Sequence, residues 1–198
     1  MIGDSVAIMT VINPVISGGG RREPMARNVE IKARLNQGAW EQVREQADRL
    51  SASPPEVINQ KDTFFDVLHG RLKLREFVDG TGELIFYDRP DRPGPKTSTY
   101  TLFPTASPTA LLEVLSQAIG VRGAVVKQRD LFLVGTTRVH LDRVQGLGLF
   151  VELEVALQGG ETVDYGKDVA EQLMQQLGIE AGNLVSGAYI DMLEDSAT

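Results

Sequence analysis

The stretch that decides the fold is Asn28-Val29-Glu30-Ile31-Lys32-Ala33-Arg34-Leu35. Apolar and polar side chains alternate along it, and the side chains of a β-strand point alternately to opposite faces. One face would carry Val29, Ile31, Ala33 and Leu35, and the other would carry Asn28, Glu30, Lys32 and Arg34. The stretch therefore predicts a half-buried strand whose polar face is charged.

Ionisable residues spaced two apart recur in later segments of the chain. They are Arg71, Lys73 and Arg75; Lys127 and Arg129; Arg138, His140 and Asp142; and Glu152 and Glu154. A charged strand face is most often the solvent face. Here such spacing recurs in several segments, some basic and some acidic. This recurrence favours instead a barrel whose apolar strand faces pack outward against helices while the charged side chains point inward. Inward Lys and Arg would repel one another unless a polyanion bound, and Arg matches phosphate oxygens through paired donors.

Acidic residues on the same faces predict a divalent cation. Glu30, Glu152 and Glu154 could hold a hard ion through carboxylate oxygens, and Mg²⁺ commonly bridges carboxylates and substrate phosphates. A cation beside basic side chains is typical of phosphoryl-transfer sites. His69 and His140 each admit a catalytic role, although a hydrogen-bonded structural histidine is the commoner case.

The rest of the chain predicts a strand-rich fold. Seven further strands are indicated at 57–66, 71–78, 83–89, 96–103, 123–134, 138–144 and 149–157. Apolar residues at helical spacing predict helices at 38–51, 109–119 and 167–177. Eight strands joined mostly by short turns favour a mainly β (α+β) fold, an antiparallel barrel or sandwich with a few helices.

Length and composition predict a single globular domain at residues 25–198. Residues 1–24 have no basic segment of the signal-peptide kind and contain the Gly-rich run 17–20, so we expect a disordered extension. The net charge of −7 disfavours nucleic acid and anionic membranes as partners, since both usually require a basic surface. The absence of cysteine fits a reducing compartment, and the cytoplasm is the expected location.

Several common catalytic motifs are missing from the sequence. It contains no Gly-Lys-Ser/Thr phosphate loop, no His-Glu-x-x-His helix and no Gly-x-Ser-x-Gly elbow. The charged strand faces therefore remain the strongest candidates for chemistry.

Five motifs follow one another along the chain. They are Asn-Val-Glu-Ile-Lys-Ala-Arg at 28–34, Gln-Lys-Asp-Thr-Phe-Phe-Asp at 60–66, Gly-Arg-Leu-Lys-Leu-Arg-Glu at 70–76, Tyr-Asp-Arg-Pro-Asp at 87–91 and Phe-Val-Glu-Leu-Glu at 150–154. Together they resemble the CYTH superfamily, which includes class IV adenylyl cyclases and thiamine- or inorganic-triphosphatases. The resemblance spans residues 26–194 and is nearest the class IV adenylyl cyclase branch. It implies an eight-stranded antiparallel tunnel barrel with flanking helices.

The resemblance also implies roles for individual residues. The residues that would bind Mg²⁺ or Mn²⁺ are Glu30, Glu152, Glu154 and Asp142. The phosphates would be bound by Lys32, Arg71, Lys73, Arg75, Lys96, Lys127 and Arg129, with Arg89 and Arg138 as further candidates. Lys32 and Asp142 would act directly in the reaction, Asp142 as a metal ligand or by orienting water. Asn28 stands where the family motif Glu-x-Glu-x-Lys has its first Glu, and an amide can coordinate a cation but adds no charge.

Two reactions fit such a site. The ribose 3′-oxygen of ATP could attack the α-phosphate, giving cyclic AMP and pyrophosphate, or water could attack a terminal phosphate of thiamine triphosphate or tripolyphosphate. The nearest resemblance favours the cyclase and leaves the triphosphatase as the alternative. A third reading is a non-catalytic module that binds polyphosphate, since Asn28 removes one acidic ligand. We expect a monomer or a homodimer.

Overall fold

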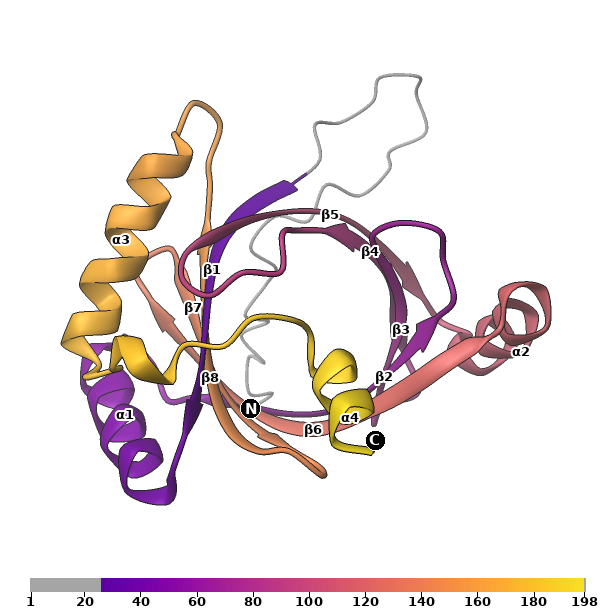
Figure 1. Ribbon diagram of the computed structural model, residues 1–198, viewed down its shortest axis with the longest axis horizontal. Helices are drawn as coiled ribbons and strands as arrows, with labels where there is room; N and C mark the ends of the chain where they lie inside the picture. Colours follow the sequence, from indigo (N-terminus) through magenta and orange to yellow (C-terminus); the bar gives the residue numbers. More distant parts are fainter. Residues whose placement is uncertain (1–25, 198) are drawn as a thin grey trace, which may run out of the picture.

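Eight antiparallel strands close into a barrel in the computed structural model, which describes residues 26–197 (Figure 1). The strands are β1 (Ala26–Leu35), β2 (Glu56–Phe65), β3 (Arg71–Phe77), β4 (Gly82–Asp88), β5 (Lys96–Thr105), β6 (Val121–Val134), β7 (Thr137–Val144) and β8 (Gly148–Ala156). The helices of this described part are α1 (Gln37–Leu50), α2 (Pro108–Ile119), α3 (Val163–Gln176) and α4 (Tyr189–Ala197), with a short 3-10 helix, η1 (Ala181–Asn183). The predicted fold is confirmed. The extension expected at residues 1–24 lies outside the described residues.

The strand order around the barrel brings distant segments of the chain together. Strands β2 to β5 form one meander and β6 to β8 another; β2 pairs with β6, and β1 closes the ring between β5 and β8. The register of β1 and β8 sets Glu30 opposite Glu154 and Lys32 opposite Glu152. Directly opposite side chains on one face of an antiparallel pair lie in contact range. The first and last strands of the barrel in chain order therefore supply one charged wall.

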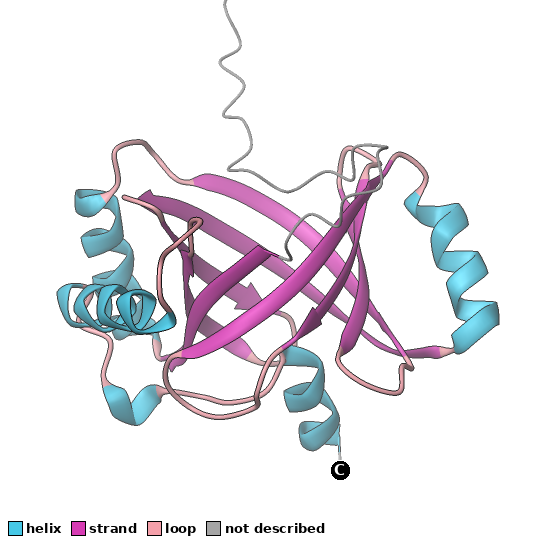
Figure 2. Ribbon diagram, turned by 90° about the horizontal axis from the view of Figure 1, so that it is seen from above, coloured by secondary structure: helices cyan, strands magenta, loops and turns pink. Residues whose placement is uncertain are grey.

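The main apolar core lies outside the barrel. The outward faces of β1, β7 and β8 pack against α1 and α3, which cover the same side of the barrel (Figure 1). Ile31 and Leu153 from the strands are buried with Trp40 of α1 and Leu173 of α3. Figure 2 shows all helices on the outside of the strands. Because the apolar faces of these strands pack against the helices, their polar faces point into the barrel interior.

The start of α3 and the presence of α4 differ from the sequence prediction. Helix α3 begins at Val163, before the predicted start at 167, because the Thr162 side chain caps it by accepting a hydrogen bond from the Tyr165 N–H at 3.1 Å. Helix α4 is an addition. The Asp191 carboxylate accepts a bond from the Ala188 N–H at 2.6 Å, which fixes its first turn. Among residues 26–197, no helix is both long and apolar enough to cross a membrane.

Helix α4 and the segment before it cross one end of the barrel (Figure 1). The Val185 N–H donates to the Lys32 carbonyl at 3.0 Å, and Leu184 forms an isolated bridge with Ala33 of β1. The Tyr189 ring packs edge-on against Phe150 of β8 with 5.0 Å between ring centroids. These contacts bring Tyr189 to the barrel interior.

Candidate functional site

The barrel encloses a cavity of about 270 Å³ that receives side chains from all eight strands. Its basic lining residues are Lys32, Lys73, Arg75, Arg89, Lys127, Arg129 and Arg138. Its acidic lining residues are Glu30, Asp62, Glu83, Glu152 and Glu154. The alternating strand faces thus point their charges inward, and the excess of basic residues favours an anionic ligand. This volume is just below the roughly 300–1,000 Å³ found for ligand pockets, so the cavity suits at most one small molecule.

Carboxylates on neighbouring strands hold the basic side chains in place along the cavity lining. Asp62 of β2 accepts hydrogen bonds from Lys73 and from Arg75 of β3, each at 2.8 Å. Burial alone would raise the pKa of Asp62, but the charges of Arg75 and Lys73 outweigh it and hold that pKa well below its usual value. The repulsion expected among inward Lys and Arg is therefore offset within the protein itself.

Asp142 of β7 holds two basic residues of β6, Lys127 and Arg129, in the same way. It is fully buried and accepts two bonds from Arg129, at 2.6 and 2.7 Å, and one from Lys127 at 3.1 Å. The Tyr189 hydroxyl of α4 donates a further bond at 3.0 Å. These bonds occupy both carboxylate oxygens, so Asp142 orients two candidate phosphate ligands and does not itself line the cavity.

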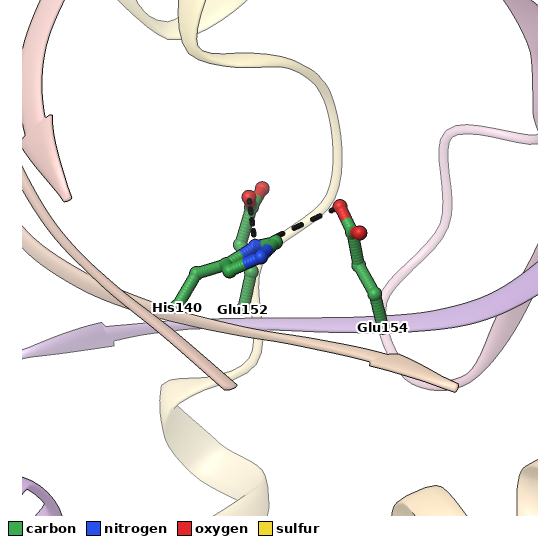
Figure 3. Close-up of side chains that lie close together, drawn as sticks. All are labelled: His140, Glu152 and Glu154. Carbon is green, nitrogen blue, oxygen red and sulfur yellow. Dashed lines mark ion pairs between the residues drawn. The ribbon is translucent and has the colours of Figure 1, made fainter. Parts of the chain in front are cut away.

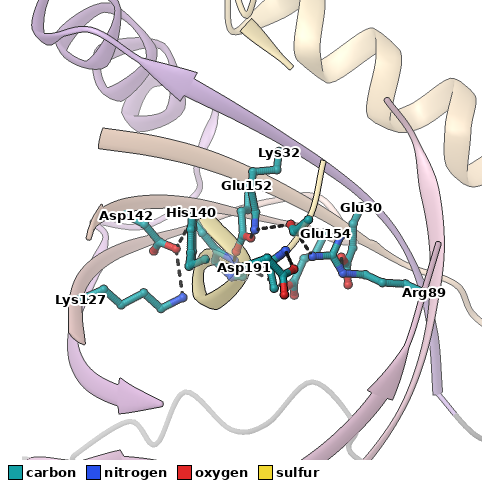
Figure 4. Close-up of polar contacts among 12 residues, drawn as sticks. Glu30, Lys32, Arg89, Lys127, His140, Asp142, Glu152, Glu154 and Asp191 are labelled. Atoms are coloured by element: carbon teal, nitrogen blue, oxygen red, sulfur yellow. Dashed lines mark hydrogen bonds and ion pairs between the residues drawn. The ribbon is translucent and has the colours of Figure 1, made fainter. Parts of the chain in front are cut away.

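Three carboxylates converge on the wall made by β1 and β8 (Figure 4). Their closest ion pairs are Glu152 with Lys32 at 3.0 Å and with Arg129 at 2.7 Å, Glu154 with Arg138 at 2.9 Å, and Glu30 with Arg89 at 3.5 Å. Burial raises the pKa of Glu30; Arg89 opposes this rise, while Glu154 and Glu152 add to it. Negative charge is therefore crowded at this wall, and a bound cation would relieve it.

His140 of β7 faces two of these carboxylates (Figure 3). Its Nδ1 lies 3.9 Å from Glu152 Oε2 and 3.7 Å from Glu154 Oε1, which is too far for a hydrogen bond. No other partner for this nitrogen exists among the described residues. A buried, unpartnered nitrogen beside two carboxylates fits a divalent cation, because such an ion would satisfy all three groups at once.

Three of the predicted site residues do not line the cavity, namely Arg71, Lys96 and Asp142. Arg71 lies by α4, where it donates to Asp91 at 2.5 Å and to Asp191 at 2.8 Å. Lys96 is 1% exposed and sits opposite Glu30 in the β1–β5 register. Burial, with the nearby charges of Arg89 and Lys32, lowers the pKa of Lys96 to about 8. Both residues stay predictions as phosphate ligands.

Asp62, Glu83 and Tyr189 line the cavity but were not among the predicted site residues. Asp62 shares the inward face of β2 with Gln60 and Phe64, so the period-two rule applied to that strand would have found it. Tyr189 belongs to the unpredicted helix α4, and nothing in its local sequence points to the barrel. Its ring lies 3.9 Å from the Lys32 ammonium.

Apolar side chains from β2 to β6 also line the cavity. Its apolar lining residues include Ile58, Phe77, Ile85, Leu102 and Leu131. The same space therefore combines a charged wall with a surface on which an uncharged ring could pack.

The CYTH domain family model matches residues 26–189 of the chain. No curated protein sequence matches the chain. The PH1012 protein from Pyrococcus horikoshii OT3 shares the fold at 20% identity and a TM-score of 0.74, covering 84% of this chain and 99% of that one.

Two further solved structures share the barrel. A "putative adenylate cyclase" from Vibrio parahaemolyticus is 18% identical with a TM-score of 0.67, covering 87% of this chain and 99% of that one. A "putative adenylyl cyclase" from Hippeastrum, described as having a dominant triphosphatase activity, is 14% identical with a TM-score of 0.61, covering 87% and 96%. At these identities the likeness establishes the fold.

Proposed function

Because the chain belongs to the CYTH domain family, we propose that its barrel binds the triphosphate group of a small molecule and breaks one of its phosphorus–oxygen bonds. The observation that carries the proposal is the convergence of seven basic and five acidic side chains on one cavity. Basic donors fixed in advance stabilise charge on phosphate oxygens without reorganising during the reaction. The ordered pairing of Asp62 and Asp142 with their basic neighbours provides this fixation.

The proposal includes a divalent cation, Mg²⁺ or Mn²⁺, held by Glu30, Glu152 and Glu154. When bound, such an ion would supply positive charge that neutralises the phosphate oxygens and the leaving group. For Asp142 we favour a positioning role over metal binding, because Arg129, Lys127 and Tyr189 already occupy its oxygens. Lys32 lies at the cavity between Glu152 and the Gly187 carbonyl, where it can contact a phosphate oxygen.

The first reaction we propose is cyclisation of ATP. The ribose 3′-hydroxyl would lose its proton to solvent as its oxygen attacks the α-phosphorus, the bond to the β-phosphate would break, and pyrophosphate would leave with the bonding electrons. This reaction requires the nucleoside to be oriented beside the triphosphate. The apolar lining of the cavity, with Ile58, Phe77 and Leu131, offers a surface for the base.

The second candidate is hydrolysis of a terminal phosphate. It requires only that water and a triphosphate be held together, and charged residues line the cavity from seven of its eight strands. The Hippeastrum structure, named for a cyclase and described by its triphosphatase activity, is a precedent for hydrolysis on this fold. Tripolyphosphate and thiamine triphosphate are the alternative substrates.

Product analysis separates the possibilities. The protein would be incubated with ATP, thiamine triphosphate or tripolyphosphate, each with Mg²⁺ or Mn²⁺, and the products identified by chromatography and phosphorus NMR. Cyclic AMP with pyrophosphate supports the cyclase, and orthophosphate supports hydrolysis. Binding of tripolyphosphate without turnover of any substrate would support the polyphosphate-binding module. Neither binding nor turnover would overturn the proposed function.

A further inference from the structure

We propose that Nδ1 of His140 is a direct metal ligand, so that the site binds first-row transition ions such as Mn²⁺ more tightly than Mg²⁺. The inference rests on the divalent cation of the proposed function but concerns its identity. It assigns the cation a mixed nitrogen and oxygen ligand set instead of the all-carboxylate set predicted from the sequence.

The separations of the ligand atoms suit one shared ion. A cation lying about 2.0–2.2 Å from each of two ligands keeps them at most about 4.4 Å apart. His140 Nδ1 lies 3.7 Å from Glu154 Oε1 and 3.9 Å from Glu152 Oε2, and candidate ligand atoms of all three residues fall within 4.8 Å of one another. Figure 3 shows the imidazole between the two carboxylates. Small side-chain rotations would therefore complete the site, because β7 and β8 already hold the residues in register.

The state of the imidazole also suits a metal. The His140 side chain is 4% exposed, and its Nδ1 is among the few buried side-chain atoms of the described residues that have no hydrogen-bond partner. Leaving such an atom unpaired costs about 1–3 kcal/mol in the absence of a ligand. A neutral imidazole has the lone pair that coordination requires.

The ion pairs of Glu154 leave one of its carboxylate oxygens available for this coordination. Arg138 binds Glu154 through Oε2, whereas the oxygen that faces His140 is Oε1. Glu152 is more engaged, since Lys32 and Arg129 each pair with one of its oxygens. Phosphate oxygens would compete for these two basic side chains, so triphosphate and metal would favour each other's binding.

The nitrogen donor decides the preference between metals. Carboxylate oxygens suit Mg²⁺ and Mn²⁺ alike, but imidazole suits transition ions, and Mg²⁺ takes oxygen ligands in near-ideal octahedral geometry. A site with His140 as ligand should therefore discriminate against Mg²⁺. Replacing the imidazole by an amide should remove most of that discrimination.

Pulsed EPR of Mn²⁺ bound to the protein, without any triphosphate, tests the coordination directly. The chain contains two histidines, His69 and His140, and His69 is exposed. In the variant His69→Gln, prepared with ¹⁵N-labelled histidine, His140 is the sole labelled residue. We expect a directly bound ¹⁵N coupling in place of the ¹⁴N coupling of unlabelled protein. This design leaves His140 intact, so it does not depend on whether a His140 variant folds.

A titration of Mn²⁺ and Mg²⁺ provides the second measurement. His140→Gln should weaken Mn²⁺ binding at least about tenfold while changing Mg²⁺ binding much less, and His69→Gln should change neither. Bound Mn²⁺ without a histidine coupling would overturn the inference, as would failure of Mn²⁺ to bind or equal losses for both metals. A histidine coupling in a protein that turns over no triphosphate would support the inference and count against the proposed function alone.

Discussion

Glu152 and Glu154 carry the metal assignment at the scale of single residues. Both line the cavity from β8, and each is paired with a basic residue of a neighbouring strand. Burial would raise the pKa of Glu154, but His140, Arg138 and Arg129 lower it to about 2, so the carboxylate is ionised at neutral pH. The residue is therefore available as a charged ligand over the whole physiological range.

We predict that Glu152→Gln and Glu154→Gln each lower triphosphate turnover about 10²-fold, because removal of one electrostatic catalytic group typically costs that much. Circular dichroism and thermal melts should show that both variants fold. Glu76→Gln is the matched control, since Glu76 lies on the outward face of β3 and pairs with Lys61. Turnover at the wild-type level in both cavity variants would remove the two glutamates from the metal site.

Asn28 is the residue at which this chain departs from the family motif. Its side chain is 3% exposed, lines the cavity, and has an Oδ1 atom without a hydrogen-bond partner. We predict that Asn28→Glu tightens Mn²⁺ binding, because a carboxylate would add a negative ligand beside Glu30. Isothermal titration of the metal is the measurement. Unchanged metal affinity would place Asn28 away from the cation.

At the scale of elements, the strands were far easier to predict than the ends of the barrel. Alternation of ionisable residues marked β1, β3, β6, β7 and β8, because one face of each packs on helices or solvent while the other faces the cavity. The boundaries of β2 and β3 were right to within about a residue. Helix α4 was missed because its short apolar pattern is stabilised by long-range contacts, such as Tyr189 with Asp142, that no local signal encodes.

The contact between α3 and β1 allows a test of packing at this scale. A Cβ on Gly166 would lie 2.7 Å from Val29 Cγ2 and from Leu157 Cδ2. Gly166→Ala gains about 1 kcal/mol of helix propensity but should lose about 1–3 kcal/mol to overpacking, so we predict net destabilisation.

Gly38 in α1 is the matched control for Gly166. A Cβ there meets nothing closer than Asn36 Oδ1 at 3.6 Å, so Gly38→Ala should stabilise the protein by up to about 1 kcal/mol. Free energies of unfolding in urea would measure both changes. If Gly166→Ala were as stabilising as Gly38→Ala, the close packing of α3 against β1 at Gly166 would be contradicted.

At the scale of the whole molecule, the sign of the charge in the cavity differs from that of the chain as a whole, which composition alone does not show. The chain carries a net charge of −7, yet its cavity has more basic than acidic residues. Sequence periodicity could place Lys73 and Arg75 on one face, but it could not reveal that Asp62 bridges them from the neighbouring strand. The pairing of strands distant in sequence decides such contacts. The candidate residues could therefore be predicted more readily than their mutual arrangement.

The buried lysines link the stability of the whole molecule to pH. Burial, followed by the charge of Arg75, lowers the pKa of Lys73 from 10.5 to about 8, and Lys96 is lowered similarly. Between pH 8 and 10.5 the unfolded chain binds more protons at these residues than the native protein does. Their contribution to the free energy of unfolding therefore rises with pH in this window. Binding of a polyanion has the opposite dependence, because it requires the charged ammonium groups.

We therefore predict that stabilisation by tripolyphosphate, measured as the shift in Tm at a fixed ligand concentration, shrinks as the pH rises through about 8. Lys73→Arg is the matched variant, because arginine stays charged throughout and the ligand's own protonation affects both proteins equally. The decrease between pH 7 and 9.5 should be smaller in Lys73→Arg than in the wild type. An identical decrease in the two proteins would show that Lys73 does not contact the polyanion, and Lys73 would then have to be removed from the proposed phosphate site.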